Sequence, residues 1–302
     1  MSGRDTSFYY SFLVLPPRKR RAIVAVWDFC RSVDDAVDCR AVGDAVDVGD
    51  AGRVPPFDDA QGAPGGSGGA RSGPAGDPLA MWRAELNACF DGREPSTAQG
   101  KALQPYIREF SLPRQPFEDL IDGVGMDLSQ ARYPTFRALA EYCRRVASTV
   151  GLICIEIFGY RDPETRAYAV NLGMALQLTN IIRDIAADLD QGRVYLPAED
   201  MARFGVTEDG LRAGTVTPEV RDLLRFECER ARYYYRLAAD ELPRADARNL
   251  VAAEIMGGIY FEILRRIERS GYDVFSRRVR VPRPYRAWIA LRTWARTVVL
   301  RR

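Results

Sequence analysis

The chain has 302 residues, 47% of them hydrophobic, and a formal net charge of +2. These values allow a large hydrophobic core and give no electrostatic reason to expect a nucleic-acid partner. The sequence contains no histidine, which excludes Ser-His-Asp and Cys-His catalysis as well as histidine-ligated zinc or haem. A metal site must therefore use oxygen or sulfur ligands.

The six cysteines are scattered and form no C-x-x-C pair. Their apolar surroundings indicate buried free thiols, which suits a reducing cytoplasm. The opening MSGRDTSFYY lacks the apolar region of a signal peptide, and no apolar run reaches the ~18 residues of a membrane span. The sequence thus predicts a cytoplasmic location.

The first predicted helix begins at the Pro16–Pro17 pair and continues through Asp38. Asp34 and Asp38 are four residues apart, so their Cβ atoms are expected about 5–6 Å apart on one side of this helix. Trp27 and Arg31 lie on the same side.

Residues 41–80 differ from the rest of the chain because 10 of these 40 positions are Gly and 5 are Pro. Such a segment cannot bury a hydrophobic face, and we expect a disordered loop between two helices of one domain.

From Met81 onward the pattern is helical nearly throughout, apart from the short RRVRVP at 277–282, which alternates as a strand does. The predicted fold class is all-α, a single helical bundle. The predicted helices cover residues 79–90, 97–111, 115–129, 135–159, 162–190, 197–204, 208–213, 218–242, 244–270 and 284–300.

Residues 171–197 contain the most informative helix. Gln177, Asn180, Asp184 and Asp188 follow at spacings of 3, 4 and 4, so they form one polar stripe in a mostly apolar segment. Such a helix is expected to be buried on most sides, with its stripe facing an internal polar cavity.

The two D-x-x-x-D pairs suggest a chemistry. If their helices face each other, four carboxylates converge, and they need cations; Mg²⁺ prefers such hard oxygen ligands and substrate phosphate oxygens. Nearby arginines would complement diphosphate, and this combination favours departure of a diphosphate to leave a carbocation. The alternative for each pair is an ordinary solvated helix face.

These segments resemble the squalene/phytoene synthase family. CRSVDDAVD (30–38) and NIIRDIAADLDQGRVYLP (180–197) are similar to its two aspartate-rich motifs, and SFYYSFLVLP (7–16), YCRRVASTVG (142–151) and YDVFSRRVRVP (272–282) match further segments in family order. The resemblance implies one isoprenoid synthase domain over residues 1–302, with a central cavity.

The resemblance also implies a reaction, which is head-to-head (1′–1) condensation of two isoprenyl diphosphates through a cyclopropylcarbinyl diphosphate. Mg²⁺ is the implied cofactor, with Mn²⁺ as an alternative, and NADPH is not expected. The implied metal ligands are Asp34, Asp38, Asn180, Asp184 and Asp188, with Tyr142, Gln177, Asp34 and Asp184 as the catalytic residues. The implied diphosphate contacts are Ser7, Arg31, Arg193, Tyr195, Tyr260 and Arg278. The implied walls of the prenyl channels are Phe8, Val146, Ala147, Gly151, Ala169 and Gly173, although helix packing is the ordinary role of such glycines.

The segment VASTVGLICIEIFGY resembles the bacterial presqualene diphosphate synthases of hopanoid pathways, which favours two farnesyl diphosphates as substrates. A phytoene synthase acting on geranylgeranyl diphosphate is the alternative. Trp27 stands where relatives commonly have tyrosine. A non-catalytic scaffold, a head-to-tail prenyltransferase and a terpene cyclase are further alternatives, but the intact aspartate pairs and the RVYLP tail speak against them.

The final segment, YRAWIALRTWARTVVLRR, mixes tryptophans and aliphatic residues with arginines. Two interpretations are open: a helix on an anionic membrane surface, at the inner membrane face, or a helix packed on the bundle with a basic outer side.

Overall fold

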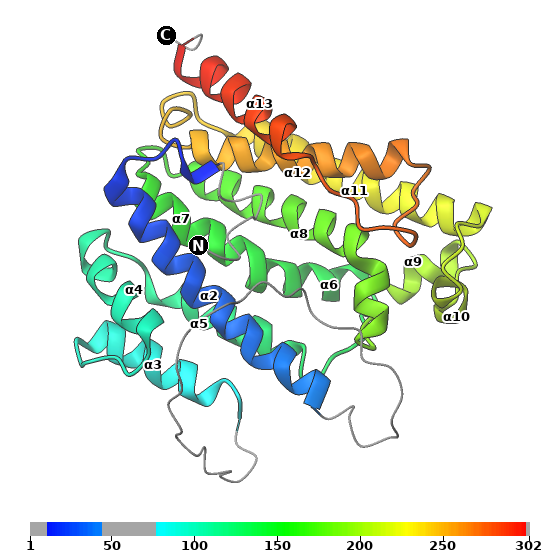
Figure 1. Cartoon of the computed structure of the whole chain (residues 1–302), viewed down its shortest axis with the longest axis horizontal. Helices are drawn as coiled ribbons and strands as arrows, with labels where there is room; N and C mark the ends of the chain where they lie inside the picture. Colours follow the sequence, from blue (N-terminus) through cyan, green and yellow to red (C-terminus); the bar gives the residue numbers. More distant parts are fainter. Residues whose placement is uncertain (1–10, 44–76, 300–302) are drawn as a thin grey trace, which may run out of the picture.

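The computed structural model describes residues 11–43 and 77–299. Within them the chain is an array of helices, and the expected all-α class is confirmed (Figure 1). The α-helices are α2 (Pro17–Gly43), α3 (Ala80–Asp91), α4 (Ala98–Glu109), α5 (Arg114–Met126), α6 (Phe136–Cys143), α7 (Thr149–Phe158), α8 (Thr165–Asp190), α9 (Ala198–Arg203), α10 (Glu208–Arg212), α11 (Pro218–Glu241), α12 (Val251–Arg269) and α13 (Arg283–Trp294). Two π-helical turns, η1 (Arg144–Ser148) and η2 (Ala295–Val299), follow α6 and α13.

Helix α8 occupies the middle of the molecule (Figure 1). It packs against α7, α11, α12 and η1, so most of its sides are covered. A helix with a mostly apolar composition is expected to be buried on most sides in this way.

Several helices begin where the sequence supplies a threonine. At each of them the Thr side chain accepts a hydrogen bond from the backbone N–H three residues later, which satisfies a donor that the helix itself leaves unpaired. These N-cap residues are Thr97, Thr135, Thr207 and Thr217.

Two hydrophobic cores meet along α8, one at each half of the helix. One joins the second half of α8 to α11 and α12, and the other joins α2, α3, α5 and α7 to the first half of α8. In the second core the Phe29 ring meets Trp82 and Phe117 edge-on, with ring centroids 5.4 and 6.0 Å away, and so ties α2 to α3 and α5.

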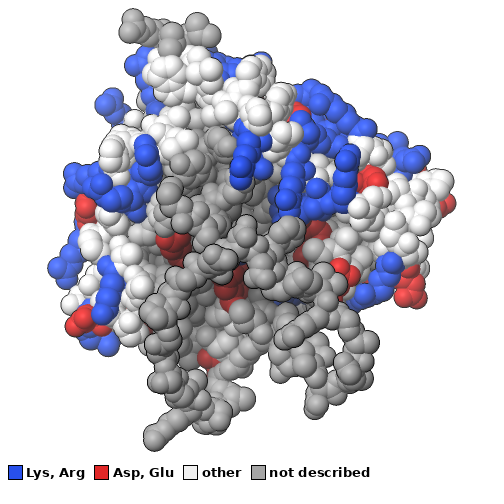
Figure 2. Space-filling model, in the orientation of Figure 1, with Lys and Arg blue, Asp and Glu red and all other residues white. Residues whose placement is uncertain are grey.

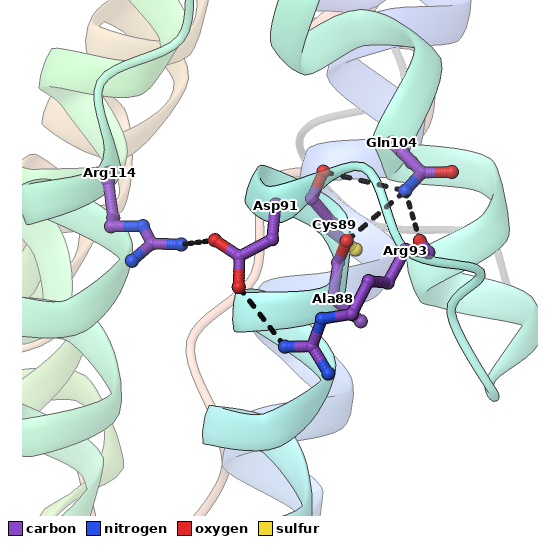
Figure 3. Close-up of polar contacts among 6 residues, drawn as sticks. All are labelled: Ala88, Cys89, Asp91, Arg93, Gln104 and Arg114. Carbon is purple, nitrogen blue, oxygen red and sulfur yellow. Dashed lines mark hydrogen bonds and ion pairs between the residues drawn. The ribbon is translucent and has the colours of Figure 1, made fainter.

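The outer corner formed by α3, α4 and α5 is held by polar contacts (Figure 3). Arg114, which begins α5, donates to Asp91 at the end of α3 over 2.7 Å. Gln104 of α4 donates to the backbone carbonyl of Arg93 over 2.6 Å. The first contact ties α5 to α3, and the second ties α4 to the turn after α3; the far end of α5 reaches the cavity described below.

The helix bounds differ from the sequence expectation at a few places. Helix α2 continues to Gly43, inside the segment predicted as a loop, and residues 44–76 lie outside the described part of the chain. The helix predicted over 135–159 contains the π-turn η1, and residues 277–282 form no strand.

The largest error concerns the helix predicted over 244–270, which begins only at Val251. The Asp246 and Ala247 N–H groups donate to the carbonyl of Pro243 and form a turn there. The Asp246 side chain is engaged elsewhere, by the backbone N–H groups of Arg161 and Asp162. A tertiary contact therefore overrides the local helical pattern.

Candidate functional site

The helices surround a cavity of about 1140 Å³. It is bounded by α2, α5, α6, α7, α8 and α12 and by residues between α12 and α13. Nearly all of the residues singled out in the sequence line it: Arg31, Asp34, Tyr142, Val146, Ala147, Gly151, Ala169, Gly173, Gln177, Asn180, Asp184, Asp188, Arg193, Tyr195, Tyr260 and Arg278. Ser7, Phe8 and the side chain of Asp38 lie outside the described part, so their expected roles stay predictions.

The stripe on α8 forms one polar wall. Asp184 pairs with Arg183 on its own helix, and Arg278 donates from across the cavity to both carboxylate oxygens over 2.8 and 2.9 Å. Burial opposes the ionisation of Asp184, but the two arginines outweigh it, and the pKa of Asp184 is lowered. Asp184 is therefore an ionised carboxylate that the two guanidinium groups hold in place.

Asp188, one turn further along, is in a different electrostatic position. Burial, together with the charge of Asp184, raises the pKa of Asp188 to about 7. Two ionised carboxylates on one buried face repel each other, and a bound cation would relieve that repulsion.

The donor set in this region fits a hard divalent metal ion. The side-chain oxygen of Asn180 is buried and has no hydrogen-bond partner within the described part of the chain, while its amide nitrogen lies 3.3 Å from the Gln177 oxygen. A free amide oxygen one turn from Asp184 is a ligand of the type that Mg²⁺ takes. No three acidic or Cys residues converge as a preformed cluster among the described side chains, which do not include that of Asp38.

Basic and aromatic groups complete the polar end. Arg193 is only 9% exposed, and its backbone N–H donates to the Asp188 carbonyl over 2.8 Å, so the loop after α8 folds back toward the stripe. The Arg183 guanidinium lies 6.0 Å from the centre of the Tyr260 ring. Arg31 has a 60% exposed side chain, 3.5 Å from Asp35, and is the least enclosed of these groups.

Asp127, which no sequence pattern singled out, also lines the cavity. It follows the last residue of α5, and its two oxygens accept hydrogen bonds from the hydroxyls of Tyr142 (2.9 Å) and Tyr195 (2.8 Å). The Tyr195 ring stacks on those of Tyr142 and Tyr133, with centroids 5.2 and 5.8 Å apart. A single aspartate after a helix has no periodic signal, so only the tertiary structure finds it. Arg286, at the start of α13, is a second lining residue that was missed.

The apolar part of the cavity lies between α2, α5, α7 and the first half of α8. Gly151 and Gly173 border it, but a Cβ atom on either would meet neighbouring backbone: the Ala169 carbonyl oxygen at 2.8 Å and the Ser148 Cα at 2.7 Å. These glycines permit close contact between helices, which is the alternative that the sequence left open.

The charged side chains are unevenly distributed on the face seen in Figure 2. Lys and Arg side chains gather over its upper half, whereas Asp and Glu side chains appear near the centre and at the edges. A concentration of positive charge of this kind suits an anionic substrate.

Comparison with known proteins identifies the family. The squalene/phytoene synthase family model matches residues 1–285. A 15-cis-phytoene synthase of Synechocystis sp. is 35% identical over 97% of this chain and 82% of its own, and phytoene synthase 2 of Solanum lycopersicum is 32% identical over 97% and 87%. The chain therefore belongs to the squalene/phytoene synthase family.

Solved structures agree with this assignment. A dehydrosqualene synthase in complex with ligand superposes with a TM-score of 0.77 at 26% identity, covering 96% of this chain and 91% of its own. The squalene synthase HpnC of Alicyclobacillus acidocaldarius gives a TM-score of 0.68 at 30% identity, covering 88% and 89%. The chain has the isoprenoid synthase fold and is a prenyltransferase of this family.

Proposed function

We propose that the chain condenses two molecules of geranylgeranyl diphosphate head to head to form phytoene. The observation that carries this proposal is one cavity with two unlike ends, a carboxylate–arginine end on α8 and an apolar end between α2, α5 and α7. A substrate with a diphosphate head and a long apolar tail matches both ends.

The residues at the polar end have distinct tasks. Asp184, Asp188 and Asn180 on α8, with Asp34 and Asp38 on α2, would hold Mg²⁺, which supplies the positive charge that makes diphosphate a better leaving group. Arg278 and Arg193 neutralise the remaining charge on the phosphate oxygens. Tyr142 and Gln177 line the cavity beside this end, where the cation forms.

The length of the prenyl chain is inferred from the relatives. Phytoene synthases of 32–36% identity cover more than 90% of the chain, which favours the C20 substrate over the C15 substrate that the sequence motifs suggested. The second candidate is presqualene diphosphate formation from farnesyl diphosphate. It is supported by the 30% identity to the squalene synthase HpnC over 88% of the chain.

A direct assay separates the candidates. The purified chain is incubated with Mg²⁺ and either geranylgeranyl or farnesyl diphosphate, without NADPH at first and with it afterwards, and the products are identified by mass spectrometry. We expect phytoene from the C20 substrate, with Asp184→Asn as the inactive control. Presqualene diphosphate from the C15 substrate alone would establish the second candidate. If the folded chain neither converts nor binds either substrate in the presence of Mg²⁺, the proposed enzymatic function is wrong and the non-catalytic scaffold remains as the alternative.

We also propose that helix α13 binds to a membrane surface. Its residues Trp288, Leu291 and Trp294 are 47%, 63% and 40% exposed, while Ile289 is buried against α12. The helix contains arginines and no acidic residue, which suits an anionic lipid surface. None of the helices within the described ranges is long and apolar enough to cross a membrane, so contact would be peripheral.

A further inference from the structure

The cluster of Asp127, Tyr142 and Tyr195 is a feature that the proposed roles of the metal and the arginines leave unexplained. Its members come from the end of α5, from α6 and from the loop after α8. Both tyrosines are buried, at 5% and 8% exposure, and both hydroxyls donate to the same carboxylate. The Tyr142 hydroxyl also has a longer contact, of 3.4 Å, with the Tyr195 hydroxyl, so the carboxylate is its nearer acceptor. All three residues face the cavity in which the reaction would occur.

The reaction requires a proton acceptor at this place. In a head-to-head condensation, C1 of the donor forms bonds to both carbons of the acceptor's double bond, and diphosphate leaves. One C1–H bond must break, because its electron pair makes the second new C–C bond. This holds for the C15 and the C20 substrate alike, and an apolar chamber offers little bulk water to take the proton.

Tyr142 by itself is a poor base. Burial and the charge of Asp127 raise the pKa of the Tyr142 hydroxyl well above its ordinary value, so the phenolate does not form. A neutral phenol accepts a proton only if it gives up its own at the same time. The Tyr142 hydroxyl donates to Asp127 Oδ2 over 2.9 Å, so a recipient for that hydrogen is in place.

We propose that Tyr142 and Asp127 form a proton relay for this step, in which Asp127 is the final acceptor. The proton from donor C1 passes to Tyr142 Oη, and the hydroxyl proton of Tyr142 passes to Asp127 Oδ2, which becomes a neutral acid. The released negative charge leaves with the diphosphate, and Asp127 returns its proton to solvent when the product departs. The inference rests on the proposed function but not on its chain length.

Tyr195 has a separate task in this arrangement. Its hydroxyl donates to Asp127 Oδ1 over 2.8 Å, so the carboxylate cannot rotate freely away from Tyr142. Asp127 acts on substrate through Tyr142 and is therefore a positioning residue as well as the place where the proton is held.

The test uses Asp127→Asn in the full chain, with Mg²⁺ and the isoprenyl diphosphate that the wild type turns over. Diphosphate release and coupled product are measured separately, and the kinetic isotope effect is measured with substrate dideuterated at C1. We expect diphosphate release to stay within about threefold while coupled product falls about 100-fold, the scale of a lost general base. The isotope effect should rise, because C1–H cleavage becomes rate-limiting.

Two further variants keep the result interpretable. Tyr142→Phe should show the same uncoupling, and the double variant should lose no more than either single one, because the two residues act as a unit. Tyr133→Phe is the matched control. Its ring stacks on Tyr195, but its buried hydroxyl has no hydrogen-bond partner within the described part of the chain, so product and isotope effect should not change.

Specific outcomes would overturn the relay. If the Asp127→Asn variant forms coupled product at a rate within threefold of the wild type, Asp127 does not take part in the step. Equal losses of diphosphate release and product, with an unchanged isotope effect, would show a merely structural role. A wild type that couples no isoprenyl diphosphate would refute the proposed function and the relay together, whereas a normal wild type beside an unaffected variant refutes the relay alone.

Discussion

At the scale of single residues, two adjacent arginines have different surroundings. Arg278 donates to both oxygens of Asp184 and borders the cavity. Arg277 is exposed and is not among the cavity-lining residues of the described chain. We expect Arg278→Ala to lower kcat/KM about 10- to 100-fold, since a hydrogen bond to a charged group contributes about 1.5–3 kcal/mol.

The control for this prediction is Arg277→Ala, which should stay within about twofold of the wild type in the same steady-state assay. The pair also shows which of the two neighbouring arginines binds the diphosphate. Equal losses in both variants would mean that the overall positive charge of the segment, and not the Asp184 contact, binds the diphosphate.

Gly173 can distinguish a role in helix packing from a role in the substrate channel. A Cβ atom at this position would lie 2.7 Å from Ser148 Cα, so Gly173→Ala must push α8 away from η1. We expect it to lower the free energy of unfolding by about 1–3 kcal/mol, as overpacking of a core does, measured by urea denaturation.

The matched variant is Gly125→Ala in α5, where the new Cβ atom would meet only the tip of the Leu79 side chain at 3.3 Å. Because that side chain can shift and alanine favours a helix, its stability should be unchanged or slightly higher. If Gly173→Ala proves neutral in stability and alters only the product, the glycine serves the substrate channel.

At the scale of elements, the start of α8 depends on Asp246. This buried carboxylate accepts the backbone N–H groups of Arg161 and Asp162 and the hydroxyl of Thr165 over 2.8–2.9 Å. Burial opposes its ionisation, but these hydrogen bonds outweigh burial and lower its pKa. We expect Asp246→Asn to cost about 1–3 kcal/mol of unfolding free energy at pH 7.

The pH dependence of this loss has a definite sign. A carboxyl group whose folded-state pKa is lowered stabilises the fold above its unfolded-state pKa of about 3.9, and this stabilisation is lost as the pH falls through the folded-state value. The difference between wild type and Asp246→Asn should therefore be full at pH 7 and shrink below about pH 4. Asp240→Asn, at an exposed site, should change stability by less than about 0.5 kcal/mol throughout.

The elements were predictable where local signals agree. Thr217 and Pro218 give the start of α11, because a cap and a fixed backbone angle occur together. The π-turn η1 was not predictable, since one extra residue in a helical turn leaves no mark in so short a segment. The turn packs against α8, and two of its own residues, Val146 and Ala147, line the cavity. The irregular turn therefore lies at the candidate site, as π-turns often do.

At the scale of the whole molecule, the part of the candidate site on α8 was predictable from the sequence, and the cluster around Asp127 was less so. Asn180, Asp184 and Asp188 share a helical stripe, which periodicity detects. Asp127 lies after the end of α5, and its partners Tyr142 and Tyr195 are 15 and 68 residues away. The family resemblance pointed to Tyr142 and Tyr195 separately, but their shared contact with Asp127 arises from the packing of separate helices, which no local sequence pattern records.

Helix α13 lies at one edge of the bundle, near the C-terminal end of the chain (Figure 1). Several residues of the segment that leads into α13, among them Val274, Arg278 and Arg286, line the cavity, so a surface bound by α13 would lie near the polar end. Substrates and products with long apolar tails partition into membranes, and a helix that combines exposed tryptophans with arginines would bring the cavity to them.

We expect the chain to sediment with vesicles that contain anionic lipid, and less so with neutral vesicles or in high salt. The variant Trp288→Ala/Leu291→Ala/Trp294→Ala should bind at least about tenfold more weakly, because each apolar side chain contributes up to about 1.5–3 kcal/mol when buried. The control is Leu128→Ala/Tyr233→Ala, at 47% and 50% exposed positions on other elements, which should bind as the wild type does. Equal binding by wild type and triple variant would assign α13 to the packing of the bundle alone.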